Sequence, residues 1–255
     1  MKQVNETLMR VRPASLGSAL KRLLRIRRQV VDTEAGRFYI DPASNFGIGV
    51  QQEGGYEPEL TRAVRTLLRE GDIFVDTGAN EGFFSIVASK AVGSTGRVIA
   101  IEPQSRLQEV LVRNIRENSA LNVDIIQRAI SDTPGFATIS LTPDMNTGSS
   151  GLFRATRYRV PTQDVLQTTL DGLFKFLSLR SVRLMKMDIE GFEYEAVLGS
   201  REVFLGTTLE YFALELHPTI LARRGKPEKD IVDFLADCGY RRDERFETLI
   251  LAKQI

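Results

Sequence analysis

The stretch DIFVDTGANEGFFS, residues 72–85, decides the fold of this chain. It begins with a short apolar run, residues 73–75, which is typical of a buried parallel strand. Gly78 and Gly82 then predict a turn, after which an apolar helical pattern resumes. Glycine suits this turn because it reaches backbone angles that other residues avoid and lets a ligand approach the main chain. Strand, glycine turn and helix form the unit that presents backbone N–H groups to a nucleotide-like ligand.

The whole chain has the composition of a folded globular protein. Of its 255 residues, 42% are hydrophobic and 26% are charged, so it can bury a sizeable core. The formal net charge of +1 gives no global electrostatic case for nucleic acid, and we expect no such partner. Cys238 is the single cysteine, which allows no intrachain disulfide. With no secretory signal pattern and no apolar run of membrane-spanning length, we expect a cytoplasmic protein.

From residue 72 onward, apolar strand patterns alternate with helical patterns. This alternation predicts an α/β protein whose mostly parallel sheet carries helices on both faces. The expected strands are residues 73–75, 97–102, 123–130, 136–141, 165–170, 184–189, 211–216 and 248–252. Residues 142–163 show no apolar period, and we expect a long loop there that could close over a substrate.

Residues 1–70 are expected to form an N-terminal extension to a ligand-binding domain over residues 71–255. The extension reads as a basic amphipathic helix, a short strand, a loop and a helix. Residues 10–28 carry arginines and lysines interleaved with leucines. One interpretation is weak contact with a membrane surface or an acidic partner. The other is a helix that packs its leucines on the body and leaves its basic groups in water.

The glycine turn departs from the dinucleotide-binding fingerprint in two places. Gly-x-Gly-x-x-Gly would place a glycine where this chain has Asn80. Asp76 also ends the strand with a negative charge, which would repel a pyrophosphate. Both departures favour S-adenosylmethionine, which carries an ammonium and a sulfonium but no phosphate. The alternatives are a nicotinamide-dependent Rossmann oxidoreductase and a non-catalytic S-adenosylmethionine-binding module.

An acid also ends the next expected strand. Glu102 follows Gly78 by a little over twenty residues, the place from which a carboxylate accepts hydrogen bonds from both ribose hydroxyls. Taken alone, Glu102 could equally be a solvated acid at a strand end. Together with Asp76, Gly78 and Gly82, it predicts one half of a nucleoside-binding site.

Several motifs together resemble the FkbM family of S-adenosylmethionine-dependent methyltransferases, over roughly residues 35–253. They are Asp-Thr-Gly-Ala-Asn-Glu-Gly (76–82), Ile-Glu-Pro (101–103), Ala-Ile-Ser-Asp (129–132), Thr-Leu-Asp (169–171) and Lys-Met-Asp-Ile-Glu-Gly-Phe-Glu (186–193). The resemblance implies a Rossmann-like class I methyltransferase sheet of seven strands with the last one antiparallel. It also implies O-methyl transfer, usually to a hydroxyl of a sugar or natural product. With these motifs, the candidate cofactor-binding residues are Asp76, Gly78, Asn80, Gly82, Glu102, Asp132 and Asp188.

Polar residues also lie at the carboxyl ends of two later strands. Lys186, Asp188 and Glu190 alternate, so they share one face while the strand persists. Glu215 and His217 close the next strand. Ligands of open α/β sheets bind at these strand ends, so we expect the polar residues to gather there. The alternative interpretations are a buried ion network and, for His217, an ordinary polar residue before a proline.

The chemistry expected at this second group is activation of a hydroxyl acceptor on a small molecule or glycan. The acceptor must lose its proton, so a base within hydrogen-bond reach is useful. Glu190, His217 and Lys186 are the candidate catalytic residues, and which of them is the base stays open. Acid and histidine side chains here could hold a hard divalent cation. Nothing in their spacing demands one, and no metal ligand is assigned.

Overall fold

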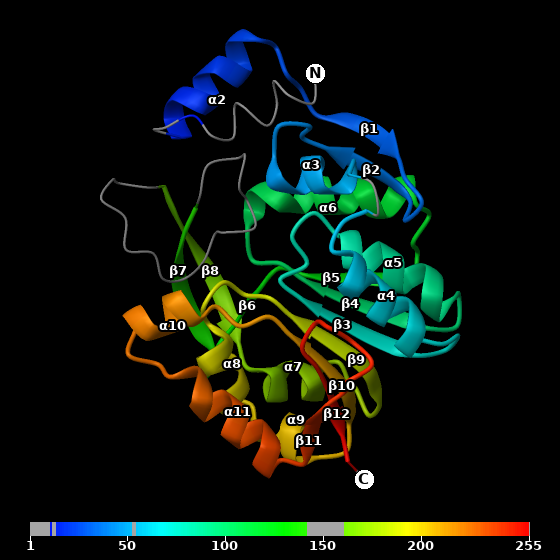
Figure 1. Ribbon diagram of the computed structural model, residues 1–255, viewed down its shortest axis with the longest axis vertical. Helices are drawn as coiled ribbons and strands as arrows, with labels where there is room; N and C mark the ends of the chain where they lie inside the picture. Colours follow the sequence, from blue (N-terminus) through cyan, green and yellow to red (C-terminus); the bar gives the residue numbers. More distant parts are fainter. Residues whose placement is uncertain (1–10, 12–13, 53–54, 142–160, 255) are drawn as a thin grey trace.

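The computed structural model describes residues 11, 14–52, 55–141 and 161–254. Its centre is a seven-stranded sheet in the order β11-β12-β10-β9-β3-β4-β5 (Figure 1). The inner strand β3 runs parallel to both neighbours, whereas the last strand, β12, is antiparallel to β10 and β11. The mostly parallel seven-stranded sheet with an antiparallel last strand is therefore confirmed. Its strands are β3 (Ile73–Thr77), β4 (Arg97–Ile101), β5 (Val123–Ile126), β9 (Val182–Met187), β10 (Leu209–Leu214), β11 (Tyr240–Arg242) and β12 (Ile250–Lys253).

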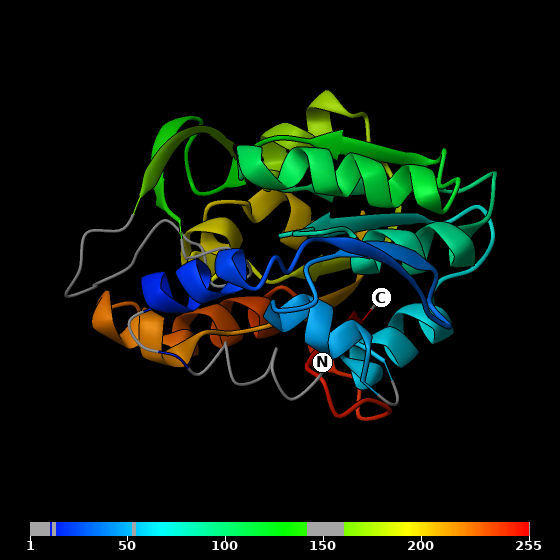
Figure 2. The same ribbon diagram turned by 90° about the horizontal axis from the view of Figure 1, so that it is seen from above.

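Helices cover both faces because the central strands are apolar on both. Phe74 and Val98 belong to a core cluster with α4 and α5, while their neighbours Val75 and Ile99 pack in another with α7, α8, α9 and α11. Helix α6 lies on the first of these faces, and Figure 2 shows it (green) well apart from α10 and α11 (orange). The helices are α4 (Pro58–Leu67), α5 (Phe83–Val92), α6 (Ser105–Glu117), α7 (Leu170–Phe176), α8 (Glu193–Leu198), α9 (Arg201–Leu205), α10 (Pro218–Arg223) and α11 (Glu228–Asp237).

A second sheet of three strands, in the order β6-β8-β7, adjoins the first. The expectation of one strand over residues 123–130 is wrong, because β5 ends at Ile126 and β6 pairs with β8 instead. A short turn closed by the Arg128 amide, which donates to the Ile126 carbonyl oxygen at 3.0 Å, separates the two strands. The strands of this sheet are β6 (Ala129–Ile130), β7 (Gly135–Ser140) and β8 (Thr162–Thr168). Most of the long loop expected before β8 lies outside the described residues.

The N-terminal part contributes to the same core. Elements α2 (Ala14–Leu23), β1 (Gln29–Asp32), β2 (Arg37–Ile40) and α3 (Asn45–Val50) precede α4. Phe38 of β2 stacks on Phe83 of α5 with ring centroids 5.3 Å apart, and Phe46 of α3 packs edge-on against Phe83. The β1–β2 hairpin and α3 therefore brace the helix that follows the glycine turn.

The end of α2 does not bury its leucines. Leu23 and Leu24 are 77% and 53% exposed, whereas Lys21 pairs with the buried Asp41. Arg28, just beyond the helix, donates two hydrogen bonds to the buried Glu81, at 2.8 and 2.9 Å. At this end of the helix the expected packing of leucines on the body is therefore wrong, whereas Arg22, Arg25 and Arg27 are exposed to water as expected. Within the described ranges, no helix is both long and apolar enough to cross a bilayer.

Candidate active site

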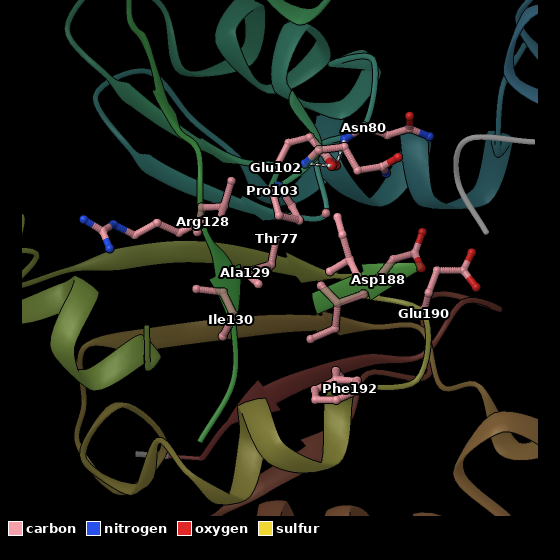
Figure 3. Close-up of a pocket in the computed structure, with 15 residues that line it drawn as sticks. Thr77, Asn80, Glu102, Pro103, Arg128, Ala129, Ile130, Asp188, Glu190 and Phe192 are labelled. Atoms are coloured by element: carbon pink, nitrogen blue, oxygen red, sulfur yellow. Dashed lines mark hydrogen bonds between the residues drawn. The ribbon is translucent and has the colours of Figure 1, made fainter. Parts of the chain in front are cut away.

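A cavity opens at the carboxyl ends of β3, β4 and β9 (Figure 3). Four of the seven candidate cofactor residues line it: Gly78, Asn80, Glu102 and Asp188. Figure 3 shows Asn80 and Glu102 on one side of the cavity, with Asp188, Glu190 and Phe192 on another. Members of both predicted polar groups, among them Glu102, Asp188 and Glu190, therefore line one cavity.

The glycine turn fits its surroundings only because two positions lack a side chain. Gly78 has a φ of +80°, and an added Cβ would overlap the carbonyl oxygen of Asp188. Gly82 has a φ of +91°, and its Cβ would meet Leu111 of α6. Asn80 takes the left-handed conformation that asparagine tolerates, with a φ of 51°. The turn thus lies directly against the Lys186–Glu193 motif at the end of β9.

Glu102 is held firmly at the cavity wall. It is 3% exposed, and its Oε2 and Oε1 accept hydrogen bonds from the amides of Asn80 and Gln104, both at 2.9 Å. Burial raises the pKa of Glu102, and those amides act in the opposite direction. Each carboxylate oxygen has a second lone pair. Both oxygens can therefore still accept a hydrogen bond from a ligand hydroxyl.

Asp76 lies beneath the turn and does not line the cavity. Its side chain is fully buried, accepts a hydrogen bond from Ser85 Oγ at 2.6 Å and lies 3.7 Å from Lys186 Nζ. Lys186 in turn donates to the Gly78 carbonyl oxygen at 3.0 Å. Burial raises the pKa of Asp76, although the Lys186 charge opposes the shift. In this arrangement Asp76 supports the turn from below through Lys186.

Gly82 and Asp132 also lie outside the cavity wall. Gly82 sits at the start of α5, where it gives α6 room to pack. Asp132 follows β6, and because β6 belongs to the small sheet, the chain there carries Asp132 to an exposed position. The structure thus separates these two residues from the four that line the cavity.

The second polar group forms a compact cluster. Lys186 Nζ lies 3.7 Å from Asp188 Oδ2, and His217 Nε2 lies 3.7 Å from Asp188 Oδ1 and 3.6 Å from Glu190 Oε2. Asp188 and Glu190 line the cavity, and His217 stands behind them at the start of α10. All three candidate catalytic residues are therefore brought together. Glu215 is exposed and lines a separate hollow with Lys186 and Glu57.

Glu193, which is absent from the predicted set, contacts His217 directly. It is fully buried, and its Oε1 accepts the Gly191 amide at 3.0 Å and faces His217 Nδ1 at 2.9 Å. Because Oε1 is already an acceptor, Nδ1 is the donor in this contact. Nε2 is therefore turned toward Asp188 and Glu190. The signal available was the second acid of the Glu-Gly-Phe-Glu motif, three residues after Glu190.

The electrostatics of the cluster are set by burial and crowded negative charge. Burial raises the pKa of Glu190 to about 7, with the Asp188 charge acting in the same direction. Burial alone lowers the pKa of His217, but the hydrogen bond with Glu193 and the surrounding carboxylates outweigh it and raise the pKa to about 9. Burial likewise raises the pKa of Glu57, a residue absent from the predicted set, to about 7.

This fold and this cavity define a class of protein. A mostly parallel seven-stranded sheet in this order, with a glycine turn and a buried acid at the carboxyl ends of its first two parallel strands, is that of the S-adenosylmethionine-dependent methyltransferases. The model of the methyltransferase FkbM domain matches residues 76–242, more than half of the chain. The chain belongs to the FkbM methyltransferase family, with S-adenosylmethionine as its cofactor. The nicotinamide-dependent alternative is thereby set aside.

Several solved structures resemble the chain at low sequence identity. An FkbM methyltransferase from Methylobacillus flagellatus is 16% identical, with a TM-score of 0.45 over 75% of this chain and 50% of that one. An S-adenosylmethionine-dependent O-methyltransferase from Thermotoga maritima is 15% identical, with a TM-score of 0.42 over 90% of this chain and 78% of that one. A putative rRNA methylase from Clostridium thermocellum is 20% identical, with a TM-score of 0.27 over 28% of this chain and 38% of that one. No curated protein matches.

Proposed function

We propose that this methyltransferase transfers the methyl group to a hydroxyl of a sugar, glycan or natural product. The observation that supports it is the cluster of Asp188, Glu190 and His217 at one end of the cofactor cavity. Such a cluster suits an acceptor that must lose a proton, as a hydroxyl must when it becomes an ether. A nucleophile that is already deprotonated would need no such group.

The cofactor would be held by the turn and by Glu102. Glu102 accepts the ribose hydroxyls with the lone pairs left free by the amides of Asn80 and Gln104. Gly78 and Asn80 shape the wall, and Asp188 lies where this wall meets the acceptor-side cluster. Asp76 and Gly82 act indirectly, by supporting the turn and its packing. Asp132 would need the segment after β6 to turn toward the cavity.

Bound S-adenosylmethionine supplies a methyl group that its sulfonium already activates. The protein therefore has to align the acceptor oxygen and exclude water. The carboxylates of Asp188 and Glu190, with the imidazole of His217, are the groups at that end which can stabilise loss of the hydroxyl proton. Lys186 is a positioning residue, because it contacts the Gly78 carbonyl and the Asp188 carboxylate and not the cavity.

A transfer assay tests this function directly. The purified chain is incubated with S-adenosylmethionine labelled in its methyl group and a panel of glycosides, polyols, amines and carboxylic acids. We expect label only in the hydroxyl compounds, in a form that survives mild alkali, because an ether resists hydrolysis that cleaves a methyl ester. Label confined to the amines, or released by alkali, would overturn the proposal.

We also propose a weak contact between residues 10–28 and an anionic membrane surface. Leu23 and Leu24 are exposed beside the exposed side chains of Arg22, Arg25 and Arg27. Apolar and cationic groups on one surface are what interfacial helices use. If this contact forms, it would favour an acceptor that is itself attached to the membrane.

A further inference from the structure

We propose that Asp188, Glu190 and His217 bind a divalent cation, with Glu193 holding the imidazole in place. These residues come from the end of β9, the following turn and the start of α10, so only the fold brings them together. The proposal that these residues bind a cation rests on their geometry alone. Its role in catalysis, given below, rests on the proposed O-methyl transfer.

The distances suit a shared ion. Each of the three side chains offers one ligand atom, and the three atoms lie within 4.8 Å of one another. Two ligand atoms bound to one ion at about 2.1–2.2 Å lie about 3 Å apart when adjacent and about 4.3 Å when opposite. His217 Nε2 is 3.7 Å from Asp188 Oδ1 and 3.6 Å from Glu190 Oε2. Small side-chain rotations would complete the site.

A buried oxygen without a hydrogen-bond donor is the second observation. Asp188 Oδ1 is inaccessible to solvent, and no described residue donates a hydrogen bond to it. A buried acceptor left in this state costs free energy that native proteins rarely leave uncompensated. The same oxygen is the one that faces His217 Nε2. A cation between the two atoms would satisfy it.

The histidine is oriented as a metal ligand is. Glu193 Oε1 faces His217 Nδ1 at 2.9 Å, and the amides of Ile189 and Gly191 fix that oxygen. Metal-bound histidines commonly donate their other ring N–H to a carboxylate, which fixes both tautomer and ring orientation. Here the arrangement directs Nε2 toward Asp188 and Glu190, where a bound cation would take the place of the Nε2 proton. A histidine that only filled space would not need a fully buried partner.

The charge around the site also favours a cation. Asp188, Glu190 and Glu193 surround one imidazole, and the lysine nearest Asp188, Lys186, is shared with Asp76. Two carboxylate oxygens and one imidazole nitrogen form a set suited to ions such as Mn²⁺, Mg²⁺ or Zn²⁺. Mn²⁺ is the most useful probe, because it is paramagnetic and accepts this mixed set.

In the proposed reaction, the cation would bind the acceptor oxygen on the side facing the cavity. A bound divalent ion lowers the pKa of a coordinated hydroxyl. The O–H bond then breaks and its proton passes to water. The oxygen forms its bond to the methyl carbon as the sulfur–methyl bond breaks, which gives the methyl ether and S-adenosylhomocysteine. Glu190 and His217 would thus activate the acceptor through the ion.

Metal binding can be measured without any acceptor. The full chain is freed of metal with a chelator, and Mn²⁺ is titrated while its electron paramagnetic resonance signal and the heat of binding are followed. We expect one Mn²⁺ per chain, and at least 100-fold weaker binding in both His217→Ala and Glu190→Gln. Glu193→Gln should weaken binding about 10- to 100-fold. Glu215→Gln, a change to a nearby acid outside the three-residue set, should bind Mn²⁺ as the parent chain does.

Separate control measurements distinguish a loss of folding from a loss of Mn²⁺ binding or of methyl transfer. S-adenosylhomocysteine affinity within about threefold of the parent shows that His217→Ala and Glu190→Gln still form the cavity. Absence of Mn²⁺ binding, or equal binding in the parent and in His217→Ala, would overturn the site. Methyl transfer that persists in excess chelator would overturn its catalytic role and leave the proposed hydroxyl methylation intact. Mn²⁺ binding with transfer to amines alone would overturn the proposed hydroxyl methylation, and with it the catalytic role of the ion, but would leave the binding site intact.

Discussion

The two halves of the site differ in how completely their polar groups are paired. On the cofactor side, both oxygens of the buried Glu102 accept backbone hydrogen bonds. On the acceptor side, Asp188 Oδ1 and Glu193 Oε2 are buried without a donor among the described residues. Asp76 Oδ1, which also lacks one, lies near Lys186 at the boundary of the two halves. A satisfied half is preorganised for its ligand, whereas an unsatisfied half indicates that a ligand or ion completes it.

Gly78→Ala should give the largest effect, because it disturbs both the cofactor turn and the backbone of Asp188 on the acceptor side. The new Cβ would overlap the Asp188 carbonyl oxygen, and alanine would be strained at a φ of +80°. We expect the free energy of unfolding to fall by about 3 kcal/mol or more and S-adenosylhomocysteine binding to become undetectable by calorimetry. Gly225→Ala is the matched control, with a φ of +67° and nothing within 4 Å of its Cβ. Equal losses in the two variants would mean that contact with Asp188 does not matter.

Arg28→Ala should give the next largest effect, because the cofactor turn relies on it from outside. Its loss would leave Glu81, which neighbours Asn80 and is 1% exposed, as an unpaired buried charge. We expect a loss of about 3 kcal/mol in the free energy of unfolding, measured by denaturant titration. Arg37→Ala removes the exposed pair with Asp32 and should cost less than about 1 kcal/mol. A similar cost for both would place the Arg28 pair among ordinary surface contacts.

Glu102→Gln and Glu190→Gln compare the halves directly. Each variant exchanges a carboxylate for an amide at the cavity wall. Glu102→Gln loses a charged acceptor for the ribose, so we expect S-adenosylhomocysteine affinity to fall about 10- to 100-fold. Glu190→Gln lies on the acceptor side and should leave that affinity within about threefold. Should calorimetry find the larger loss in Glu190→Gln, the assignment of the two halves would be reversed.

The cofactor half could be predicted largely from local sequence. The glycine turn, Asp76 and Glu102 lie within about 30 residues of one another, and a strand that is apolar on both faces fixes where the turn must stand. Local sequence does not show which way the Asp76 side chain points. Ser85 lies in the first turn of α5, and the Asp76 side chain points to its hydroxyl and to Lys186 instead of the cavity.

The acceptor half could be predicted only as a list of strand-end residues. His217 meets Asp188 and Glu190 because β9 and β10 are neighbours in register, with Met187 opposite Leu214. That pairing depends on tertiary contacts that no local pattern encodes. The same limit explains the error at residues 123–130, where a strand-like pattern interrupted by Gln127 and Arg128 is divided between two sheets. It also explains why the partner of Arg28, more than fifty residues away, was not foreseen.

The smallest effect should come from a surface that belongs to neither half. Leu23→Asn combined with Leu24→Asn removes apolar area beside exposed arginines, and we expect binding to phosphatidylserine vesicles to weaken about fivefold, or about 1 kcal/mol. Leu121→Asn is the control, since Leu121 is 94% exposed after α6 and outside the basic segment. Co-sedimentation with vesicles at low and high salt measures both contributions, because the arginine attraction is screened by salt and the leucine contribution is not. If the double variant and the control sediment alike at both salt concentrations, the leucines do not contact the membrane and only the arginine attraction remains.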